Sequence, residues 1–367
     1  MSVNTDKTKV IHFRKNSSSQ TMYDFRLGSV SVEKLSCYKY LGVLFDEYLS
    51  FEQNAKLLAE SAGRALGAIR YKLKYLKECG FLSFNTLFDC GVLSICDYAA
   101  GVWGTKKFDK IEQVLYRGAR YYLGVHRFAP TDALLGDLGW ISAKTRHKIL
   151  NMKLWNRLCG LNHSRLTRKV FTWDLLYSTR RGSWSHNAKN ILRDVGCQQY
   201  FNESMSCDIE HVKRTLSEQD CVDWDTSRYK SDKLRYYNLY KSDKDTEDYV
   251  KLPVLKYHRS LFAQFRCGIL PLQIEVGRFK NMQLHERICP ICHSAVEDEV
   301  HFLCQCPLYN HLRNPLFNCA RKAEPTFPHM DLLDKFVYLM SNHQRNIMKY
   351  LSQAVPLRSD SLYNHTG

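Results

Sequence analysis

The sequence has no apolar run of 18 residues or more, so it predicts no membrane-spanning helix. Its first residues, MSVNTDKTKVIHF, lack the apolar segment of a secretory signal peptide. Fourteen cysteines are scattered along the chain, and without a secretion signal they indicate a reducing compartment. We therefore expect an intracellular protein, in the cytoplasm, the nucleus or both. No internal repeat and no low-complexity tract occurs.

The sequence also lacks the motifs of several large enzyme classes. It has neither the P-loop GxxxxGK[ST] nor the dinucleotide-binding GxGxxG. No Ser/His/Asp or Cys/His/Asn arrangement has the spacing of a known nucleophilic site. No two aspartates are adjacent anywhere in the chain. We therefore assign no catalytic residue and expect no small-molecule substrate.

Acidic residues are too few to balance the basic ones. The chain has 37 Asp and Glu against 53 Lys and Arg, which gives a formal net charge of +16. Such an excess in a folded chain favours a polyanionic partner, RNA or DNA, although it can also serve solubility alone. No isolated basic amphipathic helix indicates a membrane surface. With 367 residues and 44% apolar side chains, we expect two or three globular domains.

The stretch CPICHSAVEDEVHFLCQC has the spacing of a metal site. Cys289 and Cys292 form a Cys-x-x-Cys pair, and His301 and Cys306 can complete a tetrahedron of the ligands that Zn²⁺ prefers. Four protein ligands predict a closed, structural zinc site. Cys304 is the alternative to Cys306, and a cluster of buried free thiols is the alternative to a metal site. His293, beside Cys292, is not expected to share the ion, and the flanking His285 and His311 are expected at the surface.

The hydrophobic pattern predicts an α+β chain that is predominantly α-helical, with a small antiparallel β region at residues 1–50. Strands are expected at 9–13, 23–27, 30–32 and 37–45. Helices are expected from 51 to Gly80 and at 83–98, 108–123, 142–159, 254–267, 309–320, 332–340 and 344–355. Residues 176–225 read as loosely organised and 356–367 as a frayed tail. The predicted segments are 1–50, a helical domain at 51–175, a connector at 176–253, a helix with the metal motif at 254–322, and closing helices at 323–367.

Five stretches, in order, resemble the C-terminal part of a reverse transcriptase from a non-LTR (LINE-type) retrotransposon. They are NTDKTKVIHF at 4–13, YLGV at 40–43, YAAGVWG at 98–104 with LGV at 123–125, RCGILPL at 266–272 with its sequel to 278, and the metal motif with Glu297-Asp298-Glu299 and CPLY at 306–309. The resemblance implies the end of a polymerase palm, a helical thumb and a zinc knuckle. YLGV would be a hairpin that helps to hold the primer end.

The chain departs from this family at the catalytic centre. Family polymerases carry paired aspartates just before the strand that resembles residues 4–13, and here no such pair exists, so the chain alone is not expected to polymerise. Asp6 and Asp46 are expected to be solvated turn residues. The resemblance implies RNA or DNA binding, with phosphate contacts from Arg259, Arg266, Arg278 and Arg287 and base stacking by Phe262 and Phe279. The alternative is a zinc-stabilised structural or protein-interaction module without nucleic acid.

Overall fold

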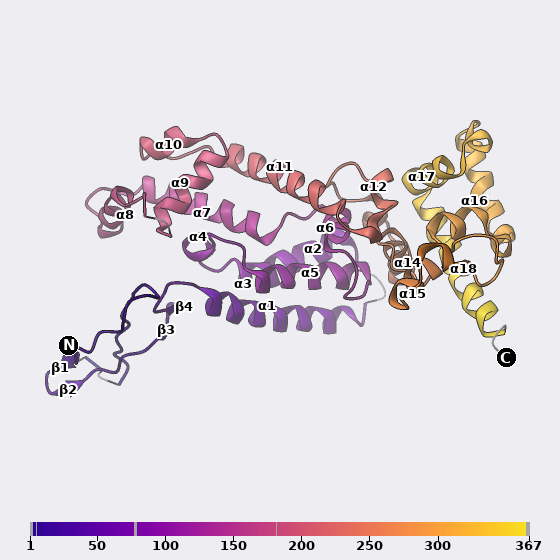
Figure 1. The fold of residues 1–367 in the computed structure, drawn as a ribbon. Coiled ribbons are helices and arrows are strands. Elements are labelled where there is room, and N and C mark those ends of the chain that lie inside the picture. Colours follow the sequence, from indigo (N-terminus) through magenta and orange to yellow (C-terminus); the bar gives the residue numbers. More distant parts are fainter. Residues whose placement is uncertain (1–2, 5, 77–78, 181, 365–367) are drawn as a thin grey trace. The chain divides into compact units, whose positions relative to one another are not determined.

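Helices form most of the computed structural model, which describes residues 3–4, 6–76, 79–180 and 182–364 (Figure 1). The strands within these ranges make two antiparallel pairs, β1 with β2 and β3 with β4. The predicted α+β, predominantly helical class is therefore confirmed. No helix in the described ranges combines the length and the apolar character needed to cross a bilayer.

The chain divides into two compact units, each assembled from three separate stretches. The first unit comprises Met1–Ala68, Asp89–Leu115 and Ala143–Leu216, and the second comprises Ile69–Phe88, Tyr116–Ser142 and Ser217–Gly367. The long helices α1 (Glu52–Leu73), α5 (Asp109–Leu123) and α11 (Ile209–Arg228) contribute residues to both units. The units therefore interleave along the sequence, and their boundaries differ from those of the five predicted segments.

The first unit begins with the four short strands. Their bounds are β1 Arg26–Leu27, β2 Val30–Ser31, β3 Cys37–Tyr40 and β4 Val43–Asp46. The prediction of one strand over 37–45 was wrong, because the chain reverses at Leu41 and Gly42. Both residues have positive φ angles, 46° and 85°, as a tight two-residue hairpin turn requires. The hairpin implied by the resemblance is present, whereas residues 9–13 form only an isolated bridge from Val10 to Lys34.

Asp46 is buried, contrary to the expectation of a solvated turn residue. Its carboxylate accepts hydrogen bonds from the backbone N–H groups of Tyr48, Ser50 and Phe51 at 2.9 to 3.1 Å. Burial alone would raise the pKa of Asp46, but these donors lower it below its ordinary value. Asp46 therefore fixes the turn that leads from β4 into α1.

Aromatic packing holds the helical part of the first unit together. Trp155 on α7 stacks on Trp184 and Phe201 and meets Phe171 edge to face. Gly101 lets α4 approach α7 closely, since an added Cβ would lie 2.9 Å from the carbonyl oxygen of Leu150. The other helices of this unit are η1 Asp89–Leu93, α3 Ser94–Cys96, α4 Ala100–Trp103, α7 Ala143–Cys159, α8 Leu166–Leu176, α9 Trp184–Asp194 and α10 Gln198–Asn202.

The second unit is built around α14 (Lys256–Arg266), which packs against α18 (Gln344–Asn364). Phe262 and Phe265 of α14 are buried, as are Ile347 and Leu351 of α18. The other helices are α2 Phe81–Phe88, α6 Thr131–Leu138, η2 Asp232–Leu234, α12 Tyr237–Tyr240, α13 Asp248–Lys251, α15 Gln273–Phe279, η3 Leu284–Glu286, η4 His301–Gln305, η5 Pro307–Tyr309, α16 Asn310–Ala323, η6 Phe327–His329 and α17 Leu332–Asn342.

Two stretches expected to be poorly ordered are helical and packed. Residues 176–225 contain α9, α10 and most of α11 and bury Leu192 and Trp224, so they contribute to both cores. The short helices expected around 188–195 and 208–216 are present as α9 and α11, and both are longer than expected. The expected frayed tail is helical up to 364 because α18 continues through Pro356, and Arg358 is buried in an ion pair with Glu297. Residues 365–367 lie outside the described residues.

Candidate metal centre

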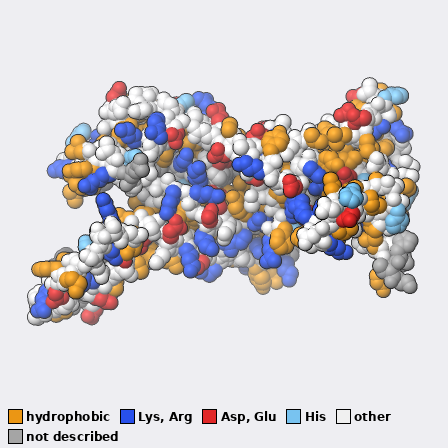
Figure 2. Space-filling view, viewed as in Figure 1, with side chains coloured by type: hydrophobic (Ala, Val, Ile, Leu, Met, Phe, Trp, Pro, Cys, Tyr) orange, Lys and Arg blue, Asp and Glu red, His pale blue; other side chains and the backbone are white. Residues whose placement is uncertain are grey.

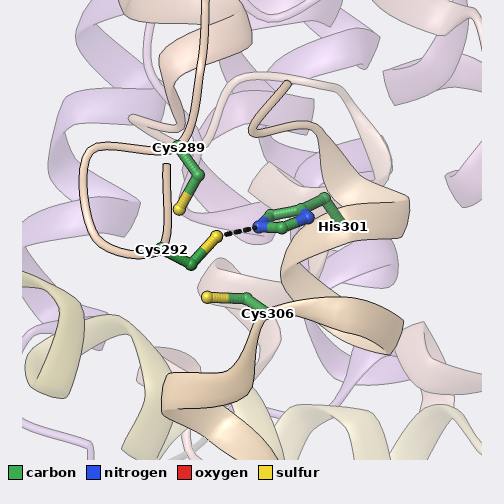
Figure 3. A group of neighbouring side chains, drawn as sticks. All are labelled: Cys289, Cys292, His301 and Cys306. Carbon is green, nitrogen blue, oxygen red and sulfur yellow. Dashed lines mark hydrogen bonds between the residues drawn. The ribbon is translucent and has the colours of Figure 1, made fainter. Parts of the chain in front are cut away.

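A short loop brings the first two cysteines together. Ile288 and Val296 form an antiparallel bridge, and the N–H of Cys289 donates to the carbonyl oxygen of Ala295 at 2.8 Å. Between them the chain turns tightly, with the N–H of His293 donating to the carbonyl oxygen of Cys289 at 3.0 Å and His293 at φ 52°. This turn directs the sulfurs of Cys289 and Cys292 to the same side (Figure 3).

The other two candidate ligands are His301, which begins the single π-helical turn η4, and Cys306, which directly follows it. The N–H of Cys306 donates to the carbonyl oxygen of His301 at 2.9 Å, a hydrogen bond between residues five apart. Such a widened turn places residues i and i+5 side by side, which accounts for the spacing of His301 and Cys306. Phe302 and Leu303 within the turn are fully buried and hold it against the core.

The four ligand atoms of Cys289, Cys292, His301 and Cys306 all lie within 4.8 Å of one another. A tetrahedral Zn²⁺ site places its sulfur and nitrogen ligands roughly 3.5–3.8 Å apart, so a small contraction would satisfy it. Sγ of Cys292 and Nε2 of His301 already lie 3.3 Å apart (Figure 3). The predicted set therefore forms a group that can hold a metal ion.

Cys289 is the deprotonated sulfur of the metal-free group, whereas Cys306, which donates a hydrogen bond to it, keeps its proton because that hydrogen bond raises its pKa. The hydrogen bond from Cys306 lowers the pKa of Cys289 to about 3, with a further contribution from His301. Burial would lower the pKa of His301, but its hydrogen bond and charge interaction with Cys289 raise it to about 9. Negative charge thus gathers where a metal cation would sit, and the cation would displace the protons.

Gln305 fixes the orientation of the histidine ring. Its Oε1 lies 3.3 Å from Nδ1 of His301 and, as a carbonyl oxygen, accepts the hydrogen on that nitrogen. With the hydrogen on Nδ1 held in this way, the other ring nitrogen, Nε2, faces the cysteines and is the one that would give up its proton to a metal ion. Partners of this kind set the tautomer of metal-binding histidines in many proteins. No sequence pattern singles out Gln305, because its role depends on the π-helical turn.

The acidic triplet after the loop anchors the metal group to the second unit. Glu297 forms a two-pronged ion pair with Arg358 at 2.6 and 2.7 Å, and Glu299 pairs with Arg235 at 2.6 Å. Asp298 accepts a hydrogen bond from the N–H of His301 at 2.8 Å. Each carboxylate therefore connects the loop to another element, so the triplet has a structural use.

The structure decides between the alternative ligands. Cys306 belongs to the metal-binding group, whereas Cys304 is buried elsewhere and does not belong to it. Burial raises the pKa of Cys304 to about 12, which keeps it a neutral thiol. His285 and His311 are exposed, as expected, and His293 is exposed and outside the metal-binding group.

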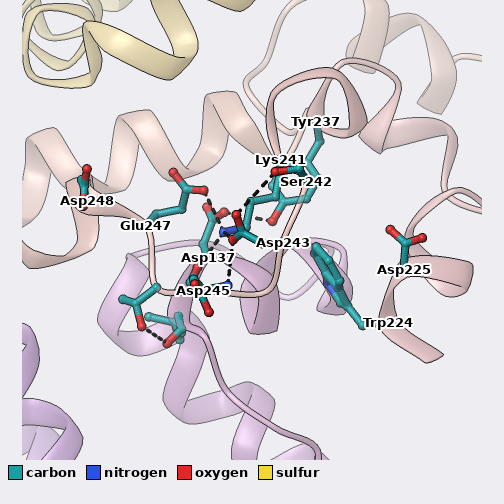
Figure 4. A network of polar contacts seen from close by, with 12 residues as sticks. Asp137, Trp224, Asp225, Tyr237, Lys241, Ser242, Asp243, Asp245, Glu247 and Asp248 are labelled. Atoms are coloured by element: carbon teal, nitrogen blue, oxygen red, sulfur yellow. Dashed lines mark hydrogen bonds and ion pairs between the residues drawn. The ribbon is translucent and has the colours of Figure 1, made fainter. Parts of the chain in front are cut away.

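The structure does not bring the four predicted phosphate-binding arginines onto one exposed surface. Arg266 is 2% exposed and donates to both carboxylate oxygens of Asp137, at 2.9 and 2.7 Å. Tyr237 and Tyr249 donate to the same carboxylate, and Glu247 lies 3.2 Å from Arg266. Figure 4 shows Asp137, Tyr237 and Glu247 of this network. Arg266 is therefore a core residue, and a phosphate contact does not fit its placement.

The other three arginines also have partners within the protein. Arg259 is buried and donates to the carbonyl oxygen of Tyr122 at 3.2 Å. Arg287 donates to the carbonyl oxygens of Ile274 and Met282, and Arg278, partly exposed, pairs with Glu275 at 3.5 Å. Arg259 and Arg266 lie seven residues apart on one face of α14, and that face is buried.

The two predicted stacking residues differ in accessibility. Phe262 is fully buried in the second unit, whereas Phe279 is 64% exposed.

Comparisons with protein-family models, with curated protein sequences and with solved structures found no match for this chain. The functional argument therefore rests on the residues and geometry of the chain itself.

Proposed function

We propose that the Cys3His group is a closed structural zinc site. Three thiolates and one imidazole form a ligand set typical of Zn²⁺, and thiolate-rich tetrahedral groups exclude hard cations such as Mg²⁺. Cys289, His301 and Cys306 are at most 2% exposed and Cys292 is half-buried, and four protein ligands leave no open position for a catalytic water. The observation that carries this proposal is the convergence of four ligand atoms within 4.8 Å.

Metal analysis tests the zinc proposal directly. The purified chain should contain one zinc per molecule, and replacing Cys289 and Cys292 together by serine should remove it and unfold the loop. Cys319→Ser is the matched control, because Cys319 is exposed and lies outside the group. Zinc that survives the double substitution, or is absent from the unmodified chain, would contradict the proposal.

We further propose that the chain binds nucleic acid, as the C-terminal part of a non-LTR-type reverse transcriptase. The net charge of +16 and the family-like order of its motifs support this role. Figure 2 shows Lys and Arg side chains along the face that α1 presents, and the basic residues of α1 and its end are exposed: Lys56, Arg64, Arg70, Lys72 and Lys74. Because the chain contains no Asp-Asp pair, the proposed role is binding and not polymerisation.

One observation favours the alternative of a protein-interaction module. The first unit has a largely apolar cavity of about 820 Å³, lined by residues that include Val102, Leu158, Val170 and Trp173. Exposed apolar surface of this kind often marks a protein-binding site. Nucleic-acid binding nevertheless accounts for the net charge of +16, whereas an apolar cavity does not explain that charge.

Salt dependence separates the two functions. Affinity for RNA or DNA should fall steeply as salt rises, because each phosphate contact releases bound counterions. We expect a linear decrease of log K with log salt concentration in fluorescence-anisotropy titrations of labelled oligonucleotides. The absence of binding at low salt would favour the protein-interaction module.

A further inference from the structure

A basic pocket of about 370 Å³ lies within the second unit. Five of its eight lining residues carry a positive charge and none carries a negative one. The cations are Arg70, Arg117, Arg120, Arg127 and Lys256, which surround the ring of Tyr121. We call these six residues the basic pocket. None of them was singled out in the sequence as a binding residue, because three separate stretches of the chain supply them.

A glycine allows these stretches to meet. Gly124 ends α5 with a φ of 71°, and a Cβ at this position would lie 2.7 Å from Cβ of Ser260 on α14. Because Gly124 has no side chain, α14 comes close enough for Ser260 Oγ to donate to the Gly124 carbonyl oxygen at 2.5 Å. The approach places Lys256 at the start of α14 near Tyr121, with Nζ 4.0 Å from the ring centroid.

Four cations of the basic pocket, Arg70, Arg120, Arg127 and Lys256, have no acidic partner in the part of the chain that the structure describes. Among residues 3–4, 6–76, 79–180 and 182–364, no carboxylate lies within 4 Å of the charged nitrogens of Arg70, Arg120, Arg127 or Lys256. Nε of Arg120 is buried without a hydrogen-bond partner in the same ranges. Burial lowers the pKa of Arg120, and burial with repulsion from Arg259 and Arg70 lowers that of Lys256. Such a cluster costs stability until an anion enters it.

An exposed pair of aromatic rings adjoins the basic pocket. Phe128 and Phe279 are 53% and 64% exposed, and their ring centroids lie 6.2 Å apart in an edge-to-face arrangement. Arg127 joins the two features, because it lines the pocket while its guanidinium carbon lies 4.7 Å from the Phe128 centroid. Nζ of Lys233 lies 5.7 Å from the Phe279 centroid, but this lysine is already paired with Glu275 at 2.5 Å, so Arg127 is the available cation beside the rings.

We propose that this surface binds single-stranded nucleic acid, with backbone phosphate in the basic pocket and an unpaired base on the Phe128–Phe279 pair. This inference rests on the proposed nucleic-acid function and names its contact surface. Cationic grooves beside exposed aromatic rings are the usual means of binding single strands, whose bases are free to stack. A duplex hides the faces of its bases and so offers this surface phosphates alone.

Two variants and three ligands test the inference. The pocket variant replaces Arg70, Arg127 and Lys256 by glutamine, and its charge-matched control replaces Arg321, Lys322 and Lys349, which are exposed and outside the pocket. The stacking variant replaces Phe128 and Phe279 by alanine, with Trp173→Ala, 57% exposed in the first unit, as its control. The ligands are a single-stranded DNA, the same strand with abasic sites throughout, and the corresponding duplex.

The pocket variant should lower the slope of log K against log salt by about 2 to 3, close to one for each lost phosphate contact, whereas its control should change it less. The stacking variant should weaken binding of the intact single strand by about five- to 150-fold and leave binding of the abasic strand unchanged. The unfolding temperature of the pocket variant should change little, because the loss of the cation–ring contacts with Tyr121 and Phe128 is offset by the relief of repulsion among the cations.

Two failures are distinguishable. If the unmodified chain binds none of the three ligands, the proposed nucleic-acid function is wrong. If it binds them but the pocket and stacking variants match their controls, nucleic acid is bound elsewhere and this inference alone is overturned. Equal affinity for the intact and abasic strands would likewise overturn the role of the aromatic pair.

Discussion

Replacing Arg358 by methionine should lower the free energy of unfolding by about 3–5 kcal/mol, the usual cost of leaving one member of a buried ion pair unpaired. The pair lies between α18 and the metal-binding loop, with the side chains of Arg358 and Glu297 only 9% and 1% exposed. Its two hydrogen bonds measure 2.6 and 2.7 Å. Glu297 also accepts the N–H of Gln273 at 2.7 Å, so its carboxylate cannot turn toward solvent without a second loss.

The assay is denaturant unfolding of the zinc-loaded chain, followed by circular dichroism. The control is Lys251→Met, which breaks the exposed pair of Lys251 with Asp248 in the same unit and should cost less than about 1 kcal/mol. A double variant with Glu297→Gln should be more stable than Arg358→Met alone, since it no longer buries an unpaired carboxylate. A loss for Arg358→Met no larger than that of the control would refute the reasoning.

Three further predictions concern other residues. Arg266→Gln should lower the free energy of unfolding by about 3–5 kcal/mol, because Asp137 loses its buried ionic partner. It should leave the slope of log K against log salt for nucleic-acid binding unchanged, and a lower slope would support the predicted phosphate contact of Arg266. Gln305→Ala should weaken zinc about 10- to 100-fold in chelator competition, because His301 loses its fixed tautomer, and an unchanged affinity would contradict this role. Burial would raise the pKa of Asp97, but His147 and Arg146 outweigh it and hold this pKa below its ordinary value. The ionised Asp97 therefore stabilises the folded chain fully above about pH 4, and this contribution to the free energy of unfolding is lost as pH falls through the lowered pKa. Asp97→Asn should flatten this acid dependence in pH-dependent unfolding, and an unaltered profile would count against it.

The metal-binding group was predictable from the sequence because its determinants are local. Its four ligands lie within 18 residues, and the spacing of Cys289 to Cys292 and of His301 to Cys306 is short enough for one turn each to set the geometry. The choice of Cys306 over Cys304 depends on the π-helical turn, and no sequence pattern predicts that turn. The long amphipathic helices were predictable for a similar reason, since their apolar residues repeat every three or four positions.

Long-range partners account for the failures. Arg266 has the sequence context of a surface arginine, and only the fold shows that Asp137, 129 residues earlier, accepts its hydrogen bonds. The error at residues 37–45 has a local cause. Leu41 adopts a positive φ and the chain turns there, whereas its β-branched and aromatic neighbours favour a continuous strand. The basic pocket likewise requires α1, α5 and α14 to meet, which no local pattern predicts.

The central claim is that one zinc ion is held by Cys289, Cys292, His301 and Cys306. X-ray absorption at the zinc edge of the purified chain tests it most directly. The account predicts three sulfur neighbours at about 2.3 Å and one nitrogen at about 2.0–2.1 Å, with no bound water. A first shell with oxygen ligands, with fewer than three sulfurs, or unchanged after Cys306→Ser would contradict it.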